Sequence, residues 1–499
     1  MKKYFLAATL IGVVGAAIAQ TPEDALRYSW LQNSGTARSQ SIGNANGAIG
    51  GEISTIFSNP ANIGFYKSGD FVISAGANMF NNKATYLGQS STDNKSSGFL
   101  GTTGFVLGKP TQRNGSVKSS AFGLAINKLA DFNNRITYTN KGGTLSKSSM
   151  ADYFIQDATD NNGLNPYGSE LAVNAGWVKD DNGALSSPAI DLIESGSGLE
   201  QKQTIVTNGG ITEMAFAGAA NFNDKVFLGG SIGLPILRYG ATRQYTEQDP
   251  TTNANGFDAA WFDDDLITKG VGINVKAGVV IKATDNIRVG FAAHTPTFYS
   301  LSDSYFATAG ANLDQGSNGD KEVSSKELVY DYNLQTPYKL MGSFAVLFGN
   351  VHDVSTQRGF LSGDVEYINY ASSKFRTTSD NGGDDGYFSN LNSAVGNAYK
   401  GAVNARLGAE VKFNPIAVRL GGAYYGNPYN NIAGEDGNIT QVTGGLGFRN
   451  KGFFIDLGYV HSLGKDVIFP YRLNNQSLMN NANIKSTNSR VLLTLGFKI

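Results

Sequence analysis

An alternation of apolar and polar residues runs along the chain from residue 70 to the end. In 70–80 every second residue is apolar or small, and the same period of two recurs in 99–107 and 122–126. Because successive side chains of a strand point to opposite faces, this period predicts strands with one apolar face. The pattern indicates an all-β protein.

Later alternating runs come in pairs joined by short turns. These turns are Asn223-Asp224, Ala283 to Asn286, Asn414-Pro415 and Arg449 to Gly452. Longer polar connections, rich in Asp, Asn and Gly, separate the pairs over about 132–202, 246–265, 307–322, 377–395, 427–438 and 465–485. Strict alternation of short turns and long extracellular loops is typical of outer-membrane barrels and argues against a soluble sandwich. We therefore expect a transmembrane antiparallel β-barrel of about 14 strands, an even number as such barrels have.

The C-terminal strand shows the alternation most clearly. We expect one set of side chains to face lipid, namely Val491, Leu493, Leu495, Phe497 and Ile499. The other set, Thr494, Gly496 and Lys498, would face the lumen. Such a strand with a late aromatic residue is suited to recognition by the barrel-assembly machinery, whereas an ordinary edge strand would leave its apolar face unexplained.

The segment Gly35 to Phe65 follows neither the helical nor the strand period, because glycines interrupt it. Glycine costs about 1 kcal/mol against alanine inside a helix. The few apolar side chains of the segment do not offset an ordering entropy of about 1 to 2 kcal/mol per residue. It can therefore pack only inside something larger, which predicts a plug, or hatch, in the barrel lumen. A Gly/Ser-rich linker is the alternative.

The stretch that begins at Thr21 predicts a short helix, since Thr21 can cap it and Pro22 suits the first turn. This helix would lie either on the surface or within the plug. Residues 1–19, with Met-Lys-Lys, an apolar run and Ala17-Ile18-Ala19, are typical of a secretory signal peptide. The expected organisation is a signal peptide over 1–19, a plug over 20–69 and the barrel over 70–499.

Composition agrees with a membrane barrel. Gly accounts for 62 of 499 residues and charged residues for only 16%, and the chain has no Cys and a formal net charge of -1. A net charge near zero argues against a nucleic-acid partner. The sequence has no run of 18 or more apolar residues, so we expect no transmembrane helix.

We find no motif for catalysis, and expect no enzyme, cofactor or metal site. The three histidines, His294, His352 and His461, are far apart in sequence. Asp263-Asp264-Asp265 and Asp384-Asp385 lack the spacing of a calcium loop, and we expect them in solvated acidic loops. Charged residues such as Asp456, Glu410 and Arg419 fit the polar lumen of a barrel.

A resemblance to a known family is carried by short motifs near the N-terminus. They are Leu26-Arg27-Tyr28-Ser29, Gly35-Thr36-Ala37-Arg38, Gly43, the Gly47 to Gly51 run, and Asn59-Pro60-Ala61 followed by Gly64-Phe65. With these motifs the chain resembles the FadL/TodX family of outer-membrane transporters of hydrophobic compounds, in the form common among Bacteroidetes. Asn62 departs from the family pattern, where a glycine commonly follows Asn-Pro-Ala, as do Asn44 and Asn46.

The resemblance implies a hatch that closes the lumen and a kinked third strand that opens a lateral exit. On this sequence the third strand would span about Ala121 to Leu129, with the break at or near Asn127 to Asn134. The residues implied in hatch gating are Asn59, Pro60, Ala61, Gly64, Phe65 and Arg38. Asn-Pro-Ala suits a hinge, because proline fixes its own φ and restricts the preceding residue.

The resemblance further implies passive transport of hydrophobic small molecules, with long-chain fatty acids as the expected class, across a Gram-negative outer membrane. The partners would be the ligand, outer-membrane lipid and, during biogenesis, the barrel-assembly machinery. The sequence leaves open a second function, that of a PorV-like secretion component or another assembly subunit that binds a protein through its loops. The predicted plug argues against a water-filled porin.

Overall fold

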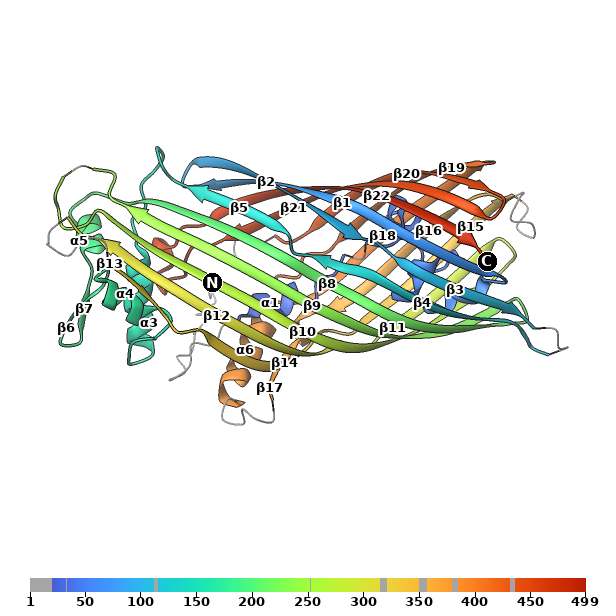
Figure 1. Ribbon diagram of the computed structural model, residues 1–499, viewed down its shortest axis with the longest axis horizontal. Coiled ribbons are helices and arrows are strands. Elements are labelled where there is room, and N and C mark those ends of the chain that lie inside the picture. Colours follow the sequence, from blue (N-terminus) through green and yellow to red (C-terminus); the bar gives the residue numbers. More distant parts are fainter. Residues whose placement is uncertain are drawn as a thin grey trace, which may run out of the picture.

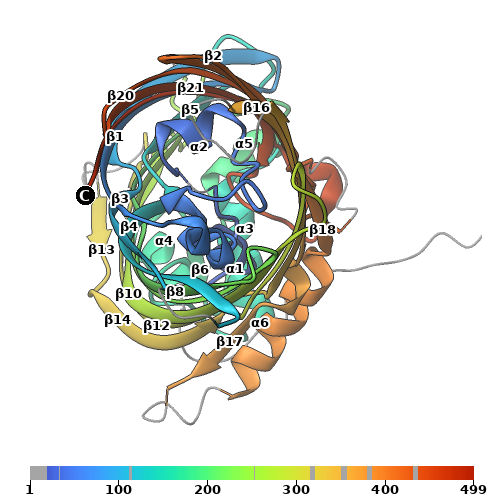
Figure 2. The ribbon, with the colours of Figure 1, turned by 90° about the vertical axis from the view of Figure 1, so that its right-hand side faces the viewer.

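The computed structural model describes residues 20–32, 34–111, 115–251, 253–314, 321–349, 357–378, 385–430 and 436–499. In this part of the chain an antiparallel β-barrel surrounds helical N-terminal segments (Figures 1 and 2). The segment predicted as a signal peptide, 1–19, lies outside the described residues.

The strands in the first half of the sequence are β1 (Gly69–Tyr86), β2 (Gln89–Leu100), β3 (Thr103–Pro110), β4 (Val117–Asp131), β5 (Asn134–Thr139), β6 (Lys179–Asp181), β7 (Ala184–Ser186), β8 (Glu200–Phe222) and β9 (Val226–Gln248). Those that follow are β10 (Ala259–Lys282), β11 (Ile287–His294), β12 (Phe298–Asn312), β13 (Lys321–Ser324), β14 (Leu328–Gln335), β15 (Lys339–Gly349), β16 (Gln357–Asn369) and β17 (Lys374–Thr377). The last are β18 (Gly401–Phe413), β19 (Ile416–Tyr425), β20 (Ile439–Asn450), β21 (Phe453–Ile468) and β22 (Ala482–Lys498).

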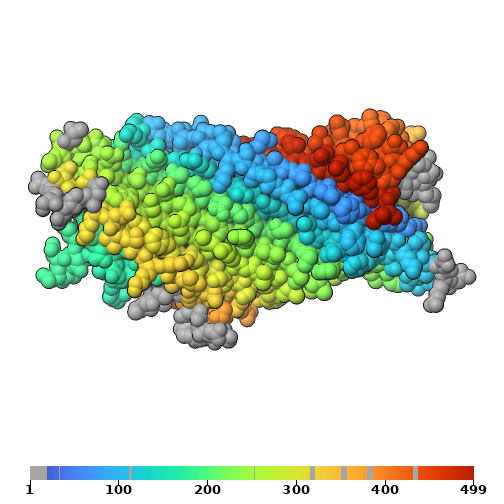
Figure 3. Space-filling model, in the orientation of Figure 1, coloured from blue at the N-terminus to red at the C-terminus, as the bar shows by residue number. Residues whose placement is uncertain are grey.

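The sheet closes because β1 pairs with β22 in continuous register from Asp70↔Lys498 to Tyr86↔Ala482. Figure 3 shows this closure on the surface, where the first strands (blue) lie directly beside the last (red). Several consecutive segments continue one another along the wall, for example β2 with β3 and β11 with β12, which pair successively with the same neighbour. Counted in this way the wall has 14 strands, as the sequence predicted.

Outward-facing side chains form an apolar belt around the barrel. Leu493 of β22 is 44% exposed and Ile73 of β1 also 44%, whereas Thr494 is fully buried on the lumen side. Tyrosines such as Tyr367, Tyr424 and Tyr459 are exposed on the same outer surface. The alternation read from the sequence thus separates the outer face from the lumen face, as predicted.

The short turns are confirmed, and several of the long connections are shorter than predicted. Asn223 and Asp224 both have φ of 54°, the conformation of a tight hairpin turn. The predicted connection 246–265 is wrong in extent, because β9 continues to Gln248 and β10 begins at Ala259. The predicted connection 465–485 is also too long at both ends, because β21 continues to Ile468 and β22 begins at Ala482. Polar residues continue these strands beyond the apolar belt, where alternation gives no signal.

Three of the other long connections contain regular structure, whereas the described residues of 427–438 lie between β19 and β20 without a helix or strand, as predicted. The stretch predicted as irregular over 132–202, apart from a helical turn or two near Met150 to Ala158, holds β5, the β6–β7 hairpin and helices α3 (Met150–Asp160), α4 (Ser169–Ala175) and α5 (Pro188–Glu194), and α3 confirms the predicted helical turns. Within 307–322, β12 extends to Asn312 and β13 begins at Lys321. Within 377–395 lies most of α6 (Asp385–Ala398), which follows the short 3₁₀ turn η3 (Tyr370–Ser372) and β17. Another 3₁₀ turn, η4 (Gln476–Leu478), lies before β22.

The N-terminal elements lie inside the barrel, as Figure 2 shows. They are helices α1 (Pro22–Arg27) and α2 (Ala37–Ser41) and the 3₁₀ helices η1 (Ile53–Phe57) and η2 (Pro60–Phe65). We call residues 20–66 the plug. Among the described residues, no helix has the length and apolar character needed to cross a membrane.

Candidate functional site

The first helix of the plug packs on the barrel wall. Thr21 precedes the helix, and the N–H and hydroxyl of Thr21 donate to Asp24 Oδ2 at 2.9 and 3.1 Å. The guanidinium of Arg27 lies 4.4 Å from the ring centroid of Tyr239 in β9. Leu26 is buried in the same apolar cluster as Tyr239. The helix predicted from Thr21 therefore belongs to the plug, and not to the outer surface.

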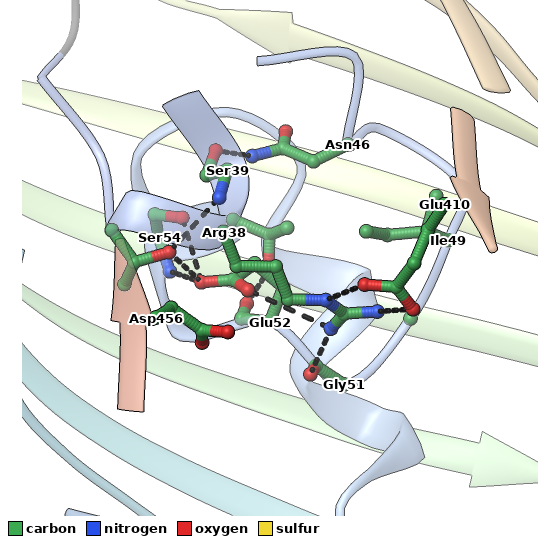
Figure 4. Close-up of polar contacts among 12 residues, drawn as sticks. Arg38, Ser39, Asn46, Ile49, Gly51, Glu52, Ser54, Glu410 and Asp456 are labelled. Atoms are coloured by element: carbon green, nitrogen blue, oxygen red, sulfur yellow. Dashed lines mark hydrogen bonds and ion pairs between the residues drawn. The ribbon is translucent and has the colours of Figure 1, made fainter. Parts of the chain in front are cut away.

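Arg38 of α2 joins two parts of the plug to the barrel wall (Figure 4). Its Nε donates to Glu410 Oε2 in β18 at 3.1 Å, and its guanidinium also pairs with Glu52 in the plug at 3.7 Å. Glu410 in turn accepts from Arg419 Nε of β19 at 2.6 Å, and Arg419 pairs with Asp456 of β21. The lumen charges predicted from sequence thus form one buried network that holds the plug.

The charge of Arg38 is stabilised by this network. Burial alone lowers the pKa of Arg38, but the carboxylates of Glu410 and Glu52 outweigh burial and raise that pKa well above its ordinary value. Arg38 therefore stays ionised, and removal of either carboxylate would leave a buried cation with one partner fewer. Breaking a buried pair in this way costs about 3 to 5 kcal/mol in typical proteins.

Asn59, Pro60 and Ala61 form the start of η2 and are all buried. Asn59 Oδ1 accepts from Ala61 N at 3.2 Å, which caps the 3₁₀ helix. Its Nδ2 donates to Gly47 O at 2.8 Å and to Val279 O of β10 at 3.3 Å. The motif therefore joins two parts of the plug to each other and also joins the plug to the wall. Its function as a hinge stays a prediction.

Gly64 and Phe65 lie at the end of η2 against β9. The rings of Phe65 and Phe227 stack with centroids 3.7 Å apart and an interplanar angle of 9°. The guanidinium of Arg288 in β11 lies 4.5 Å from the centroid of Phe65 and also donates to Ile49 O. A Cβ on Gly64 would lie 3.3 Å from Phe227, so glycine lets the plug approach β9 closely.

The wall meets the plug with glycines of its own. A Cβ on Gly278 would lie 1.9 Å from Asn59 Oδ1, and one on Gly421 would lie 2.4 Å from the carbonyl carbon of Ile42. At other wall glycines, too, an added Cβ would lie within 3 Å of a plug atom; these are Gly108, Gly123, Gly229, Gly290, Gly408, Gly445 and Gly458. These residues were missed from the sequence, because the high glycine content does not reveal which strand positions face the plug.

The asparagines that depart from the family pattern are structural members of the plug. Asn62 Oδ1 accepts from Gly50 N at 2.8 Å, and its Nδ2 donates to Gly47 O at 2.8 Å. Asn46 Nδ2 donates to Ser39 Oγ at 2.7 Å, and Ser39 Oγ donates to Asn44 Oδ1 at 2.7 Å. In place of further glycines, side-chain amides tie the turns of this plug together.

A cavity of about 60 Å³ lies between plug and wall, smaller than the roughly 300–1,000 Å³ of small-molecule sites, so a ligand larger than a few atoms fits there only when the plug moves. Its apolar lining includes Tyr28, Leu31, Phe57, Leu129, Pro337 and Tyr425. Its charged lining consists of Glu213, Lys276, Lys339, Glu366 and Arg406. The cavity therefore presents apolar and ionic surface side by side.

The charges of the cavity do not pair completely. Lys276 pairs with Glu213 at 2.5 Å and Arg406 with Glu366 at 2.8 Å, which leaves Lys339 without an ion pair among the described residues. Arg406 Nε is buried without a hydrogen-bond acceptor in the same part of the chain. An anionic group in the cavity would find two donors there that have no acceptor among the described residues.

The barrel wall has a seam between its second and third strands. β3 pairs with β4 from Thr103↔Ile126 to Pro110↔Ser119, but among the described residues no ladder joins β2 to β4 or β5. Side chains bridge them instead. Ser97 Oγ donates to Asp131 at 2.8 Å, and Ser91 Oγ donates to Thr137 O at 2.6 Å.

The third strand breaks at this seam. β4 ends at Asp131 and β5 begins at Asn134, so the interruption falls within the range predicted from the sequence, although the strand begins earlier, at Val117. The ladder of β4 with β8 is also irregular between Lys128 and Ala130. The second strand is interrupted as well, at Gly101 and Thr102, where Thr102 N donates to Gly35 O of the plug at 2.9 Å.

The residues considered for metal binding do not meet. In the described residues no group of His, Asp and Glu side chains is arranged for a metal ion. His294 donates to Ser58 O of the plug and His461 lies 3.1 Å from Ser489 Oγ, while His352 and Asp384 lie outside the described residues. The expectation of an acidic loop at Asp263-Asp264-Asp265 is wrong, because all three belong to β10, where Asp264 pairs with Arg243.

Comparisons with known proteins bear on the fold. No protein-family model and no curated protein sequence matches the chain. A solved structure of a Pseudomonas aeruginosa FadL homologue is similar with a TM-score of 0.55 and 14% identity, over 93% of this chain and 98% of that one. A solved structure of a deletion mutant of the monoaromatic hydrocarbon channel TodX is similar with a TM-score of 0.52 and 13% identity, over 93% of this chain and 98% of that one. At these identities the likeness shows a shared fold, that of a FadL-type barrel.

Proposed function

We propose that this chain is a passive outer-membrane transporter of hydrophobic small molecules. The apolar belt on the outer face is the surface that a barrel presents to lipid. The barrel shares its fold with a FadL homologue and with the hydrocarbon channel TodX. Burial of the plug along the lumen argues against an open aqueous pore.

The cavity between plug and wall carries this proposal. A hydrophobic ligand would lose about 25 cal/mol for each Å² of apolar surface that it exposes to water, so it needs an enclosed apolar path. Tyr28, Leu31 and Phe57 of the plug supply such surface on one side of the cavity. Movement of the plug would therefore change the shape of the ligand site directly.

The charged part of the cavity favours an amphiphile with an acidic head, of which long-chain fatty acids are the expected class. A carboxylate there would pair with Lys339 and accept from Arg406 Nε, the two donors that find no acceptor in the described part of the chain. Charge-assisted hydrogen bonds of this kind are about twice as strong as neutral ones. A plain hydrocarbon would leave both donors unpaired, which costs free energy in a buried site.

Exit would take place through the seam between β2 and the β4–β5 strand. Backbone ladders are costly to open, but this seam is held by side-chain contacts such as Ser97 with Asp131. In the proposed route the gating residues of the plug are Arg38 with its ion pairs, and Asn59, Pro60, Ala61, Gly64 and Phe65 with their wall contacts. The alternative of a protein-binding subunit has less support, because Tyr153 is the one large exposed hydrophobic residue on α3, α4 and α5.

The test is ligand binding by the purified protein. Mass spectrometry of lipid extracted after detergent purification should detect fatty acid. Titration should then show that Lys339→Gln weakens binding of oleic acid about tenfold, the loss of one charge-assisted contact, and leaves binding of oleyl alcohol unchanged. Lys374→Gln, an exposed lysine on β17, is the matched control. Absence of any copurified amphiphile together with no binding of either compound would overturn the proposal.

A further inference from the structure

A second discontinuity of the wall lies far from the seam. The ladder between β16 and β18 ends at the pair Asn369↔Gly401. Beyond it β17 continues the wall and pairs with β14, from Tyr332↔Thr377 to Gln335↔Lys374. Among the described residues no strand pairs with the other edge of β17. The wall is therefore open between β17 and the start of β18.

Helix α6 covers this opening from outside. Figure 2 shows α6 on the outer side of the wall next to β17, while α1 lies inside the barrel, yet the two helices are in contact. Phe388, Leu391 and Val395 are buried in the same apolar cluster as Ala25 and Leu26 of α1. A helix outside can touch a helix inside only through a gap in the wall.

Apolar packing and a few hydrogen bonds hold α6 at the edge of the opening. Asn392 Oδ1 accepts from Phe375 N at 2.7 Å and its Nδ2 donates to Phe375 O at 2.9 Å, so one side chain takes the place of a neighbouring strand. Tyr387 donates from its hydroxyl to Gln20 O of the plug at 3.0 Å. The face away from the barrel is polar, with Ser389, Ser393 and Asn397 exposed.

We infer that α6 is a lid over a second ligand port, through which an amphiphile with an alkyl chain enters the lumen. This inference rests on the proposed transport function. The opening begins beside Tyr367, which is exposed at the outer face and pairs with Val403. Tyrosines mark the border of the apolar belt in membrane barrels, so the port lies where an amphiphile in the outer leaflet keeps its head.

The surface beneath the lid continues to the cavity. Phe388 and Leu391 of α6, Leu26 of α1 and Tyr28 belong to one apolar cluster, and Tyr28 lines the cavity. When α6 swings out, an alkyl chain replaces its apolar face on α1 and remains out of water along this cluster. Because α1 is part of the plug, occupation of the port also acts on the plug.

The test is to lock the lid with a reducible cross-link, which is clean here because the chain has no Cys. Tyr330 of β14 and Phe388 have ring centroids 6.4 Å apart, and the double variant Tyr330→Cys with Phe388→Cys is joined by a short bifunctional thiosulfonate. Stopped-flow fluorescence then measures association and dissociation of a dansyl-labelled undecanoic acid with the detergent-purified protein. Gln156→Cys with Asn474→Cys, which ties α3 to a neighbouring loop, is the control pair.

A lid predicts that the cross-link slows association and dissociation at least tenfold, leaves the equilibrium affinity unchanged, and is reversed by reductant, with no change in the control pair. Unchanged rates in the locked protein, with normal binding by the wild type, would overturn the port and make α6 a fixed part of the wall. Failure of the wild type to bind the probe at all would overturn the transport function and the port together.

Discussion

Arg38 in the plug and Glu410 in β18 are 372 residues apart in sequence and form a two-point contact inside the barrel. Arg38 Nε lies 3.1 Å from Glu410 Oε2, and Nη2 lies 3.4 Å from Oε1. The contact joins β18, in the second half of the wall, to α2 of the plug, which is synthesised long before it. Seating of the plug therefore depends on completion of the barrel.

We expect Arg38→Gln to loosen the plug by about 3 kcal/mol or more, because it leaves Glu52 without its cation and Glu410 with Arg419 and the more distant Lys412. Conductance of single proteins in planar bilayers should rise relative to the wild type. The control is Arg472→Gln, which removes a half-exposed pair with Glu23 of the plug, worth at most about 1 kcal/mol. Equal conductance of both variants would contradict a latch at Arg38.

Gly278→Ala should unseat the plug while the barrel still folds. The new methyl group would lie 1.9 Å from Asn59 Oδ1, a distance that forces the plug to move, and overpacking of this kind costs about 1 to 3 kcal/mol. Gly218→Ala in β8 is the matched control, since nothing lies within 4 Å of its Cβ. Heat-modifiable migration on gels shows whether the barrel is folded, and proteolysis of the N-terminal segment shows whether the plug is seated. Protection of the plug equal to that of Gly218→Ala would refute the close contact.

A disulfide across the seam should prevent lateral exit of the ligand and leave binding of the ligand unchanged. Ser91→Cys in β2 with Thr137→Cys in β5 replaces two residues that a 2.6 Å hydrogen bond already joins. After oxidation we expect uptake of radiolabelled oleate by a Gram-negative host without its own transporter to fall about tenfold, with recovery on reduction, because the lateral path needs separation of β2 from β5. Affinity of the purified protein for oleate should stay the same. Uptake that persists in the oxidised form would direct the exit elsewhere.

The lid proposed at α6 predicts that ligand association becomes faster when the hydrogen bonds that hold α6 are removed. Asn392→Ala deletes both hydrogen bonds to Phe375, each worth about 1 kcal/mol. Association of the dansyl-labelled acid should accelerate severalfold, measured by stopped-flow fluorescence. Ser393→Ala, next to it on the exposed face, should leave the rate unchanged. A slower rate in Asn392→Ala would mean that α6 guides the ligand and does not block it.

Prediction from sequence worked where one local pattern decides the outcome. The alternation that ends in Leu493 and Phe497 indicated the outward face, and Asn223-Asp224 indicated a hairpin turn. It failed where strands extend past the apolar belt, because Asp263, Asp264 and Asp265 look like loop residues until Arg243 is known to face Asp264. In the same way, nothing local identifies α6 as a cover for the wall.

The sequence by itself determined the barrel, the turns and the presence of a compact N-terminal segment, because each depends on residues that are close along the chain. Only the tertiary structure decided how that segment is held. Glu410 pairs with Arg38, and Gly278 lies against Asn59. The partners are hundreds of residues apart in sequence, and closure of the sheet brings them together. The places of Lys339 in the cavity and of β17 beside β14 are likewise set by which strands meet, a relationship that no short-range pattern records.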